Sequence, residues 1–166
     1  MEKITLPAGF EDILPDQMEK WYFAESTIRK VFSIYGFSEI RTPCLEQTAL
    51  FVRGIGENTD IVEKEMYTFG SKEDSLSLRP EGTASVIRSY IENGKDKFST
   101  FQKYWYMGSM FRHEKPQKGR KREFYQAGIE ILGTFLPAAD AEAIILGYRL
   151  LQSLRVKRFQ LKLNTT

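Results

Sequence analysis

The chain has 166 residues, of which 42% are hydrophobic and 28% are charged, and its formal net charge is +2. This length suits one compact domain with a real hydrophobic core, and the composition is that of an ordinary soluble globular protein. The small net charge excludes nucleic-acid binding driven by overall charge, so such a role would need a local cluster of basic residues.

Cys44 is the only cysteine and His113 the only histidine of the chain. A single cysteine excludes an internal disulfide and a zinc site built from several cysteines, and a single histidine is a poor basis for a metal centre. We therefore expect no protein-held metal. Cys44 is interpreted as a small strand residue, because as a nucleophile it would have only His113 as its base.

No targeting signal is visible at the N-terminus, which lacks a basic flank followed by an apolar run. No segment contains the roughly 18 consecutive apolar residues that span a bilayer. We expect a reducing, cytoplasmic setting and no membrane association.

The first half of the chain begins with an irregular stretch punctuated by Pro7, Gly9 and Pro15. A helix is predicted from Gln17 to about Tyr35, because apolar residues recur there at three- and four-residue spacing. Gly36 suits the end of this helix. Next come a strand over 37–43, a helix over 46–53, and a short hairpin whose polar turn covers 70–74. The apolar face of the first helix contains Met18, Trp21, Ala24, Ile28, Val31, Phe32 and Tyr35.

The second half starts with a predicted helix that has Pro80 and Glu81 in its first turn and ends at 93–94. Aromatic and β-branched runs over 101–114 and 122–133 predict two strands of a long antiparallel hairpin. Asp140 is expected to cap a helix that runs to about Leu154, and 158–163 alternates as a last strand. The predicted buried face of that helix contains Ala141, Ile144, Ile145, Tyr148 and Leu151.

These elements predict an α+β fold in which helices flank a mainly antiparallel sheet. No internal repeat or low-complexity segment interrupts it. On the strand that returns from the long hairpin, Phe124, Gln126, Ile129 and Glu130 are expected to fall on two faces unless a bulge or twist intervenes.

The tip of the long hairpin, "FRHEKPQKGRKREF" at 111–124, contains six Lys or Arg residues. Arg112 and Glu114 lie two apart on a predicted strand, so they share a face that offers donors for a phosphate and an acceptor for an amino group. Phe124 adds an apolar surface for a planar base. Lys118 and Arg120 would add charge on a mobile tip. The alternative is an ordinary solvated loop.

Five segments, in this order, resemble the class II aminoacyl-tRNA synthetases in the form carried by histidyl-tRNA synthetases. They are "GFEDILP", "GFSEIRTPCLE", "IGENTDIVEKEMYTF", "LRPEGTAS" and "YWYMGSMFRHEKPQKGRKREFYQAGIEILG". The second resembles motif 1 with its Pro43, at about 17–44, and the last resembles motif 2, at about 104–133. The resemblance covers nearly all of Gly9 to Gly133. It implies the class II catalytic core and a homodimer formed through the first long helix and its strand.

The resemblance also implies roles for single residues. Arg112 would be the catalytic residue and would bind the α-phosphate of ATP and the carbonyl of the amino acid. Glu114 would lie near the adenine amino group, Phe124 would stack on adenine, and Arg120 would reach the outer phosphates. Residues implied to bind histidine are Glu81, Gly82, Thr83, Arg112, Gln126 and Glu130.

Two of these glutamates also have simpler interpretations. Glu81 could serve only as a negative charge at the start of a helix, which favours the helix dipole. Glu130 could lie on the solvent face of the sheet. The chemistry agrees with the implied roles, because a substrate ammonium needs a carboxylate and an imidazole with N–H groups needs acceptors.

The activity implied is that of a histidine–tRNA ligase, which activates L-histidine with ATP and Mg²⁺ and transfers it to tRNA(His). Motif 3 and the anticodon-binding domain of the family are not found before Thr166, so the chain is interpreted as the N-terminal half of the catalytic domain, inactive alone. One alternative is a non-catalytic paralogue that senses histidine, such as the regulatory subunit of ATP phosphoribosyltransferase. Another is a small RNA-binding module whose binding would weaken steeply with salt.

Overall fold

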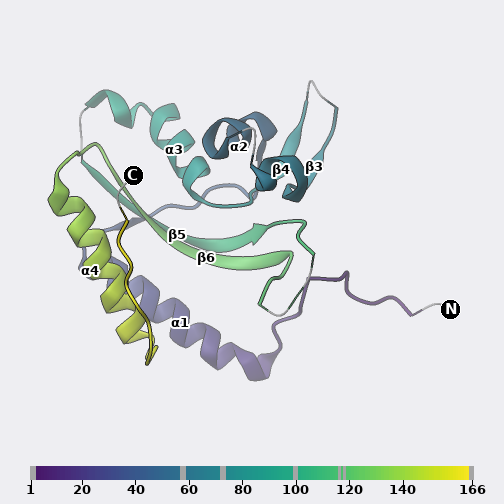
Figure 1. The fold of residues 1–166 in the computed structure, drawn as a ribbon, viewed down its shortest axis with the longest axis horizontal. Helices are drawn as coiled ribbons and strands as arrows, with labels where there is room; N and C mark the ends of the chain where they lie inside the picture. The colour runs from purple at the N-terminus through teal and green to yellow at the C-terminus, as the bar shows by residue number, and fades with distance from the viewer. Residues whose placement is uncertain are drawn as a thin grey trace.

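A computed structural model describes residues 3–56, 59–71, 74–98, 101–115, 117 and 119–164. Within them the strands form two three-stranded sheets, ordered β1-β5-β6 and β2-β4-β3. A long β5–β6 hairpin runs through the centre of the molecule, with α1 and α4 on one side and α2, α3 and the smaller sheet on the other (Figure 1). The predicted α+β arrangement is confirmed.

Strands β5 (Gln102–Phe111) and β6 (Glu123–Leu132) pair antiparallel over their whole length. The register runs without a bulge from Gln102 opposite Leu132 to Phe111 opposite Glu123. Because side chains alternate along a strand, the even-numbered residues of both strands share one face and the odd-numbered residues share the other. The short β1 (Ser38–Glu39) pairs parallel with the other edge of β5.

The odd-numbered face is covered by helices α1 (Pro15–Ile34) and α4 (Pro137–Ser153). The Phe32 ring centroid lies 5.6 Å from that of Trp105, and both side chains are buried. The predicted apolar face of α1 is thus confirmed over its second half. The buried residues of this core are Val31, Phe32, Phe37, Trp105 and Leu146.

Helix α4 differs from its prediction at its start and in its face. It begins at Pro137 with Leu136 as N-cap, so Asp140 lies in the first turn and is not the cap, because proline's fixed φ suits the first helical position. Ile145 and Tyr148 are about half exposed, whereas Leu146 is buried. The sequence of α4 is apolar nearly all round, so its periodicity does not select one face.

The predicted strand over 158–163 is wrong, because these residues belong to no strand or helix in the structure. Instead the ring of Phe159 packs edge-on against that of Tyr148, with centroids 5.2 Å apart. An alternating pattern forms a strand only when an adjacent strand edge accepts its backbone hydrogen bonds.

The smaller sheet joins β2 (Leu45–Gln47), β3 (Thr68–Phe69) and β4 (Leu76–Leu78), and it confirms the short hairpin. Helix α2 (Thr48–Ile55) begins two residues later than expected, because Glu46 and Gln47 pair with β4. Helix α3 (Thr83–Glu92) follows, and short helical turns occur at Ile61–Glu65 and Lys95–Phe98. Among the described residues, no helix has the length and apolarity that crossing a membrane requires.

The Phe32→Ala variant tests the core between α1 and the sheet. Removing this buried ring should lower the free energy of unfolding by about 3–5 kcal/mol. The matched control is Tyr22→Ala on the same helix, where the side chain is 62% exposed and the loss should stay below about 1 kcal/mol. Urea unfolding of both variants measures the difference, and equal losses would contradict the assigned face of α1.

Candidate active site

The even-numbered face of the long hairpin carries the polar residues singled out in the sequence. Phe124, Gln126 and Glu130 of β6 all lie on it, and Ile129 lies on the core face. Helix α3 covers part of this face, where Val86 packs with Tyr106 and Met110 of β5, and Phe124 borders this second apolar cluster. The expected split of the returning strand between two faces is confirmed.

The Pro80–Thr83 segment is fastened to the end of β5 by backbone and side-chain bonds. The amide of Phe111 donates to the carbonyl of Arg79 at 3.0 Å, and Arg112 Nε donates to the carbonyl of Pro80 at 3.0 Å. These bonds place the segment expected to bind histidine beside the arginine expected to bind ATP.

Arg79 is buried and joins three parts of the chain. Its Nε donates to the Ser109 carbonyl at 2.9 Å, and its Nη1 donates to the Thr42 carbonyl at 2.8 Å. The guanidinium needs a glycine at Gly108, where an added Cβ would lie 2.5 Å from Nη2. Arg79 therefore stabilises the junction of the two sheets directly beneath the candidate site.

The ring of Tyr106 fills the space between the loop and the sheet. An added Cβ at Gly82 would lie 2.1 Å from this ring, and one at Gly128 would lie 2.4 Å from it. Thr83 Oγ1 donates a hydrogen bond to Glu130 Oε1 at 2.7 Å. The loop is thereby held against β6 both by close packing and by a hydrogen bond.

Glu81 lies just before α3, which begins at Thr83 with Gly82 as its N-cap. The expectation that Pro80 and Glu81 occupy the first helical turn is therefore wrong. The Glu81 carboxylate accepts hydrogen bonds from the amides of Thr83 at 2.6 Å and Ala84 at 2.9 Å. It satisfies two amides that have no partner within the helix, and the remaining lone pairs of its oxygens can still accept from a ligand.

Two groups of the site have perturbed acidities. Burial raises the pKa of Glu130, the Thr83 hydrogen bond opposes this, and the negative charge of Glu81 raises it further. Burial also raises the pKa of Tyr106, with hydrogen bonding to Thr83 acting against it. Two carboxylates close together under partial burial favour a cationic or hydrogen-donating ligand.

Arg112 lies just beyond β5, and the strand expected over Arg112 and Glu114 is wrong, because β5 ends at Phe111. One further backbone bond joins the Arg112 amide to the Arg122 carbonyl at 2.9 Å. The Arg112 guanidinium carbon lies 5.1 Å from the centroid of the Phe124 ring. This stacked guanidinium is available to an anion at the open end of the hairpin.

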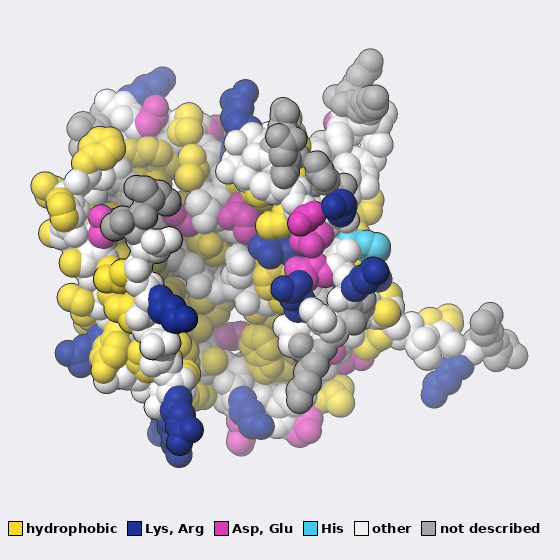
Figure 2. Space-filling model, in the orientation of Figure 1, with side chains coloured by type: hydrophobic (Ala, Val, Ile, Leu, Met, Phe, Trp, Pro, Cys, Tyr) yellow, Lys and Arg dark blue, Asp and Glu magenta, His cyan; other side chains and the backbone are white. Residues whose placement is uncertain are grey.

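The remaining charged residues lie farther along the hairpin tip. Arg120 Nη1 lies 3.2 Å from Glu114 Oε2, and the Arg120 side chain is 64% exposed. Lys118 lies outside the described residues. Acidic and basic side chains are intermixed near this end of the molecule (Figure 2), so the tip does not form a purely basic surface.

The structure thus brings the expected residues together along one face, in two groups. Glu81, Gly82 and Thr83 meet Glu130 at one end, and Arg112 meets Phe124 at the other. Phe124 and Glu130 are six residues apart on β6, which corresponds to about 20 Å. That separation favours an elongated ligand with a distinct group at each end.

Tyr106, Gly128 and Arg79 also shape this site, but sequence reasoning did not single them out. Gly128 lies directly opposite Tyr106 in the ladder. An isolated glycine within a strand pattern is a signal of close approach by another group. Only the register, which the sequence leaves open, shows that the approaching group is Tyr106.

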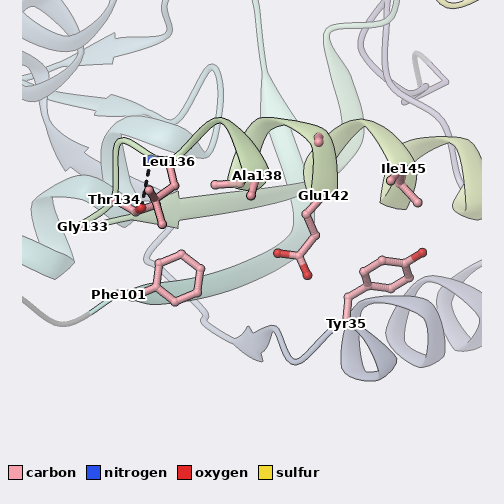
Figure 3. A pocket seen from close by; sticks show the side chains of 10 residues that line it. Tyr35, Phe101, Gly133, Thr134, Leu136, Ala138, Glu142 and Ile145 are labelled. Atoms are coloured by element: carbon pink, nitrogen blue, oxygen red, sulfur yellow. Dashed lines mark hydrogen bonds between the residues drawn. The ribbon is translucent and has the colours of Figure 1, made fainter.

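A mostly apolar hollow of about 590 Å³ lies elsewhere, between the end of α1 and the start of α4 (Figure 3). Tyr35, Phe101 and Ile145 line it together with Glu142, whose carboxylate is paired with Lys103 Nζ at 2.7 Å. None of the residues expected to bind ATP or histidine lines this hollow. With its one carboxylate already paired, it offers few groups that could orient a ligand.

Comparison with known proteins adds an independent line of evidence. The family model described as histidyl-tRNA synthetase matches residues 9–166. The chain is 51% identical over 158 residues to the histidine–tRNA ligase of Thermosipho melanesiensis. The matched segment covers 95% of this chain and 38% of that ligase. It is 51% identical over 166 residues to the ligase of Synechococcus elongatus, covering 99% of this chain and 38% of that protein. The chain therefore spans about 38% of the length of these relatives.

Solved structures agree in fold. Apo histidyl-tRNA synthetase from Staphylococcus aureus superposes with a TM-score of 0.76 at 37% identity, over 93% of this chain and 36% of that one. A Bacillus halodurans protein described as an ATP phosphoribosyltransferase regulatory subunit/histidyl-tRNA synthetase also gives a TM-score of 0.76, over 93% of this chain and 40% of that one. At 24% identity, the second likeness concerns the fold alone.

The Glu130→Gln variant tests the electrostatics of the site. A raised carboxyl pKa means that the folded state holds its proton more tightly than the unfolded state. The contribution of Glu130 to the stability of the folded state is therefore complete below about pH 4.5, the ordinary pKa of a glutamate. It is lost as the pH rises through the pKa that Glu130 has in the folded state. Glutamine keeps an acceptor for Thr83 without the charge, so the variant should be more stable than wild type at pH 7, and the difference should disappear near pH 4. Thermal unfolding across pH measures this, and a variant that is less stable at pH 7 would contradict it.

The Gly82→Ala variant tests the packing of Tyr106. The added methyl group must displace the ring, so the free energy of unfolding should fall by about 1–3 kcal/mol. Gly147→Ala is the matched control, since an added Cβ there meets nothing within 4 Å and alanine favours a helix by about 0.5–1 kcal/mol. Urea unfolding should show opposite signs for the two variants, and a harmless Gly82→Ala would contradict the packing.

Proposed function

This chain belongs to the histidyl-tRNA synthetase family, and from that membership we propose that it supplies one part of a site that activates L-histidine with ATP. The observation that carries the proposal is the fastening of the Pro80–Thr83 segment to β5 and β6, which brings Glu81, Arg112 and Glu130 onto one face. The reaction proposed is attack of the histidine carboxylate on the α-phosphorus of ATP. It releases pyrophosphate and leaves histidyl-adenylate, which is then transferred to tRNA(His).

At the buried end of the face, Glu81 and Glu130 are proposed to receive histidine. Glu81 would accept from the ammonium group and Glu130 from an N–H of the imidazole, with Thr83 and Gln126 nearby and Gly82 keeping the loop close. The raised pKa of Glu130 means that its surroundings disfavour the ionised carboxylate. A positively charged or N–H-donating ligand would offset this effect, which supports a role in binding rather than in stability.

At the open end, Arg112 is proposed to bind the α-phosphate and to stabilise the charge that develops as the carboxylate attacks. Little proton transfer is required, so positioning and charge neutralisation would supply most of the rate gain. Phe124 would then stack on adenine, Glu114 would lie near its amino group, and Arg120 would contact the outer phosphates. The cation–π contact of Arg112 with Phe124 supports placing the phosphate and the base side by side.

Magnesium is proposed to enter with ATP. Within the described part of the chain, no group of three or more His, Cys, Asp or Glu side chains could hold a metal ion. In nucleotide sites Mg²⁺ usually keeps several waters and is bound by the phosphates together with one or two carboxylates, so it needs no cluster of three protein ligands. The ion would supply neutralisation of phosphate charge, while Arg112 and Arg120 supply fixed positive groups.

The wider assignments rest on the same family membership. We propose a class II catalytic core that forms a homodimer through α1 and the strand after it, acts on tRNA(His) and works in the cytoplasm. The rival function, histidine sensing by a regulatory paralogue, shares the fold. It is disfavoured because relatives about 50% identical to this chain are histidine–tRNA ligases. An RNA-binding module is disfavoured because two basic residues of the tip are already paired with acidic side chains, Arg120 with Glu114 and Lys121 with Glu11.

The Arg112→Ala variant tests the proposed reaction. A suitable protein is a chimera in which this chain replaces the matching segment of the Thermosipho melanesiensis ligase. Histidine-dependent exchange between ATP and pyrophosphate should fall about 10²–10³-fold. Arg149→Ala is the control, because this exposed arginine lies on α4, which covers the opposite face of the long hairpin, and it should leave exchange unchanged. If the unmutated chimera is active and Arg112→Ala exchanges at the same rate, the role of Arg112 is refuted. An unmutated chimera that binds histidine but shows no exchange would favour the sensing paralogue.

A further inference from the structure

The segment at 7–11, which we name the N-terminal strap, crosses the base of the hairpin tip. The Gly9 carbonyl accepts hydrogen bonds from the amides of Arg122 at 2.8 Å and Glu123 at 3.3 Å. Gly9 has a φ of +89°, a conformation that favours glycine. The strap therefore binds the chain where it returns into β6.

Arg122 connects the strap to both sides of the hairpin tip. Its Nε donates to the Glu114 carbonyl at 3.2 Å, and its Nη1 donates to the Ala8 carbonyl at 3.4 Å. Its own carbonyl accepts the amide of Arg112 at 2.9 Å. Arg122 thus bonds to the backbone of both Arg112 and Glu114, two of the residues proposed to contact ATP.

The outgoing side of the tip is held through a second set of contacts. The Phe10 ring of the strap lies 6.5 Å from that of Tyr67, and the Tyr67 ring lies 5.2 Å from that of His113. The His113 amide donates to the Glu65 carbonyl at 2.6 Å. Lys121 also pairs with Glu11 of the strap. Strap contacts therefore reach both the outgoing and the returning chain.

These contacts lie where the sheet no longer dictates the backbone. The β5–β6 ladder ends at Phe111 opposite Glu123, and beyond it one bond joins Arg112 to Arg122 and an isolated bridge joins Gln117 to Arg120. Beyond that point the backbone of Glu114 has no strand partner. Its carbonyl is bonded to Arg122, whose side chain fits directly against Gly9, where an added Cβ would lie 2.7 Å from Arg122 Cγ.

We propose that the N-terminal strap, acting through Gly9 and Arg122, is a positioning element that sets Arg112 and Glu114 for ATP. This inference rests on the proposed function. It assigns no contact with the substrate to the strap itself. The histidine end has its own contacts through Thr83, Tyr106 and Arg79, and it shares only Arg112 with the ATP end. Loosening the strap should therefore impair ATP binding more than histidine binding.

Gly9→Ala tests this inference in the same chimera. The Michaelis constant for ATP in the exchange reaction should rise about tenfold, and that for histidine should change less than about twofold. Gly36→Ala is the matched control, because Gly36 has a φ of +76° but an added Cβ meets nothing within 4 Å. It carries the same backbone strain far from the tip and should leave both constants unchanged.

Hydrogen exchange on the 166-residue chain gives a readout that needs no activity. Amides at 111–124 should exchange faster in Gly9→Ala than in wild type or Gly36→Ala. Arg122→Lys is a second variant in case Gly9→Ala fails to fold, because lysine keeps the charge but cannot make both side-chain bonds. It should also raise the Michaelis constant for ATP more than that for histidine. The effects of Gly9→Ala and Arg122→Ala should be non-additive, since the two residues act as one unit.

An unchanged ATP constant in an active Gly9→Ala or Arg122→Lys chimera would overturn the inference. Equal increases for ATP and histidine would overturn it too, because they would indicate a purely structural role. An inactive wild-type chimera would instead count against the proposed function, and the hydrogen exchange would still decide whether the strap orders the tip.

Discussion

The uninterrupted pairing of β5 with β6 is the constraint on which the rest of this structure depends. One register places Trp105 and Ile129 against the helices and places Gln126 and Glu130 on the opposite face. A slip of one residue would move every side chain of a strand to the other face, so the core and the candidate site would be lost together. Burial of the apolar face therefore selects the register that also assembles the polar face. No further interaction is needed to place the strand residues of the candidate site on one face.

The loop that completes this face is held by groups that leave little freedom. Arg79 replaces its lost hydration with carbonyl oxygens from two distant parts of the chain, and Gly82 and Gly128 admit the ring of Tyr106 at a distance that any other residue would prevent. Within this rigid setting, Glu130 lies near Glu81 under partial burial, an arrangement that disfavours its charge. A fold optimised only for stability would avoid such a pair. Its presence at the place where loop and sheet meet supports the proposal that this face binds a ligand.

The sequence predicts the parts of this fold whose patterns are local. Helix α1 and the long hairpin follow from spacing and alternation, and the motifs indicate which residues belong to the site. The face of α4 and the expected last strand could not be predicted, because α4 is apolar nearly all round and Phe159 alternates without a neighbouring edge to pair with. The roles of Tyr106 and Arg122 were also missed. Both depend on glycines that are distant in the sequence and become neighbours only when the chain folds.

The two ends of the candidate site differ in how firmly they are built. The end proposed for histidine is bordered by Tyr106 and Thr83, whereas the end proposed for ATP extends beyond the ladder and is bordered by exposed ion pairs such as that of Arg120 with Glu114. Exposed pairs of this kind contribute about 0–1 kcal/mol. A triphosphate could therefore replace Glu114 as the partner of Arg120 with little loss of free energy, because the triphosphate carries more negative charge. A small amino acid needs a preformed pocket to be distinguished, while a highly charged nucleotide tolerates an adaptable tip, provided that the backbone at its base is held in place.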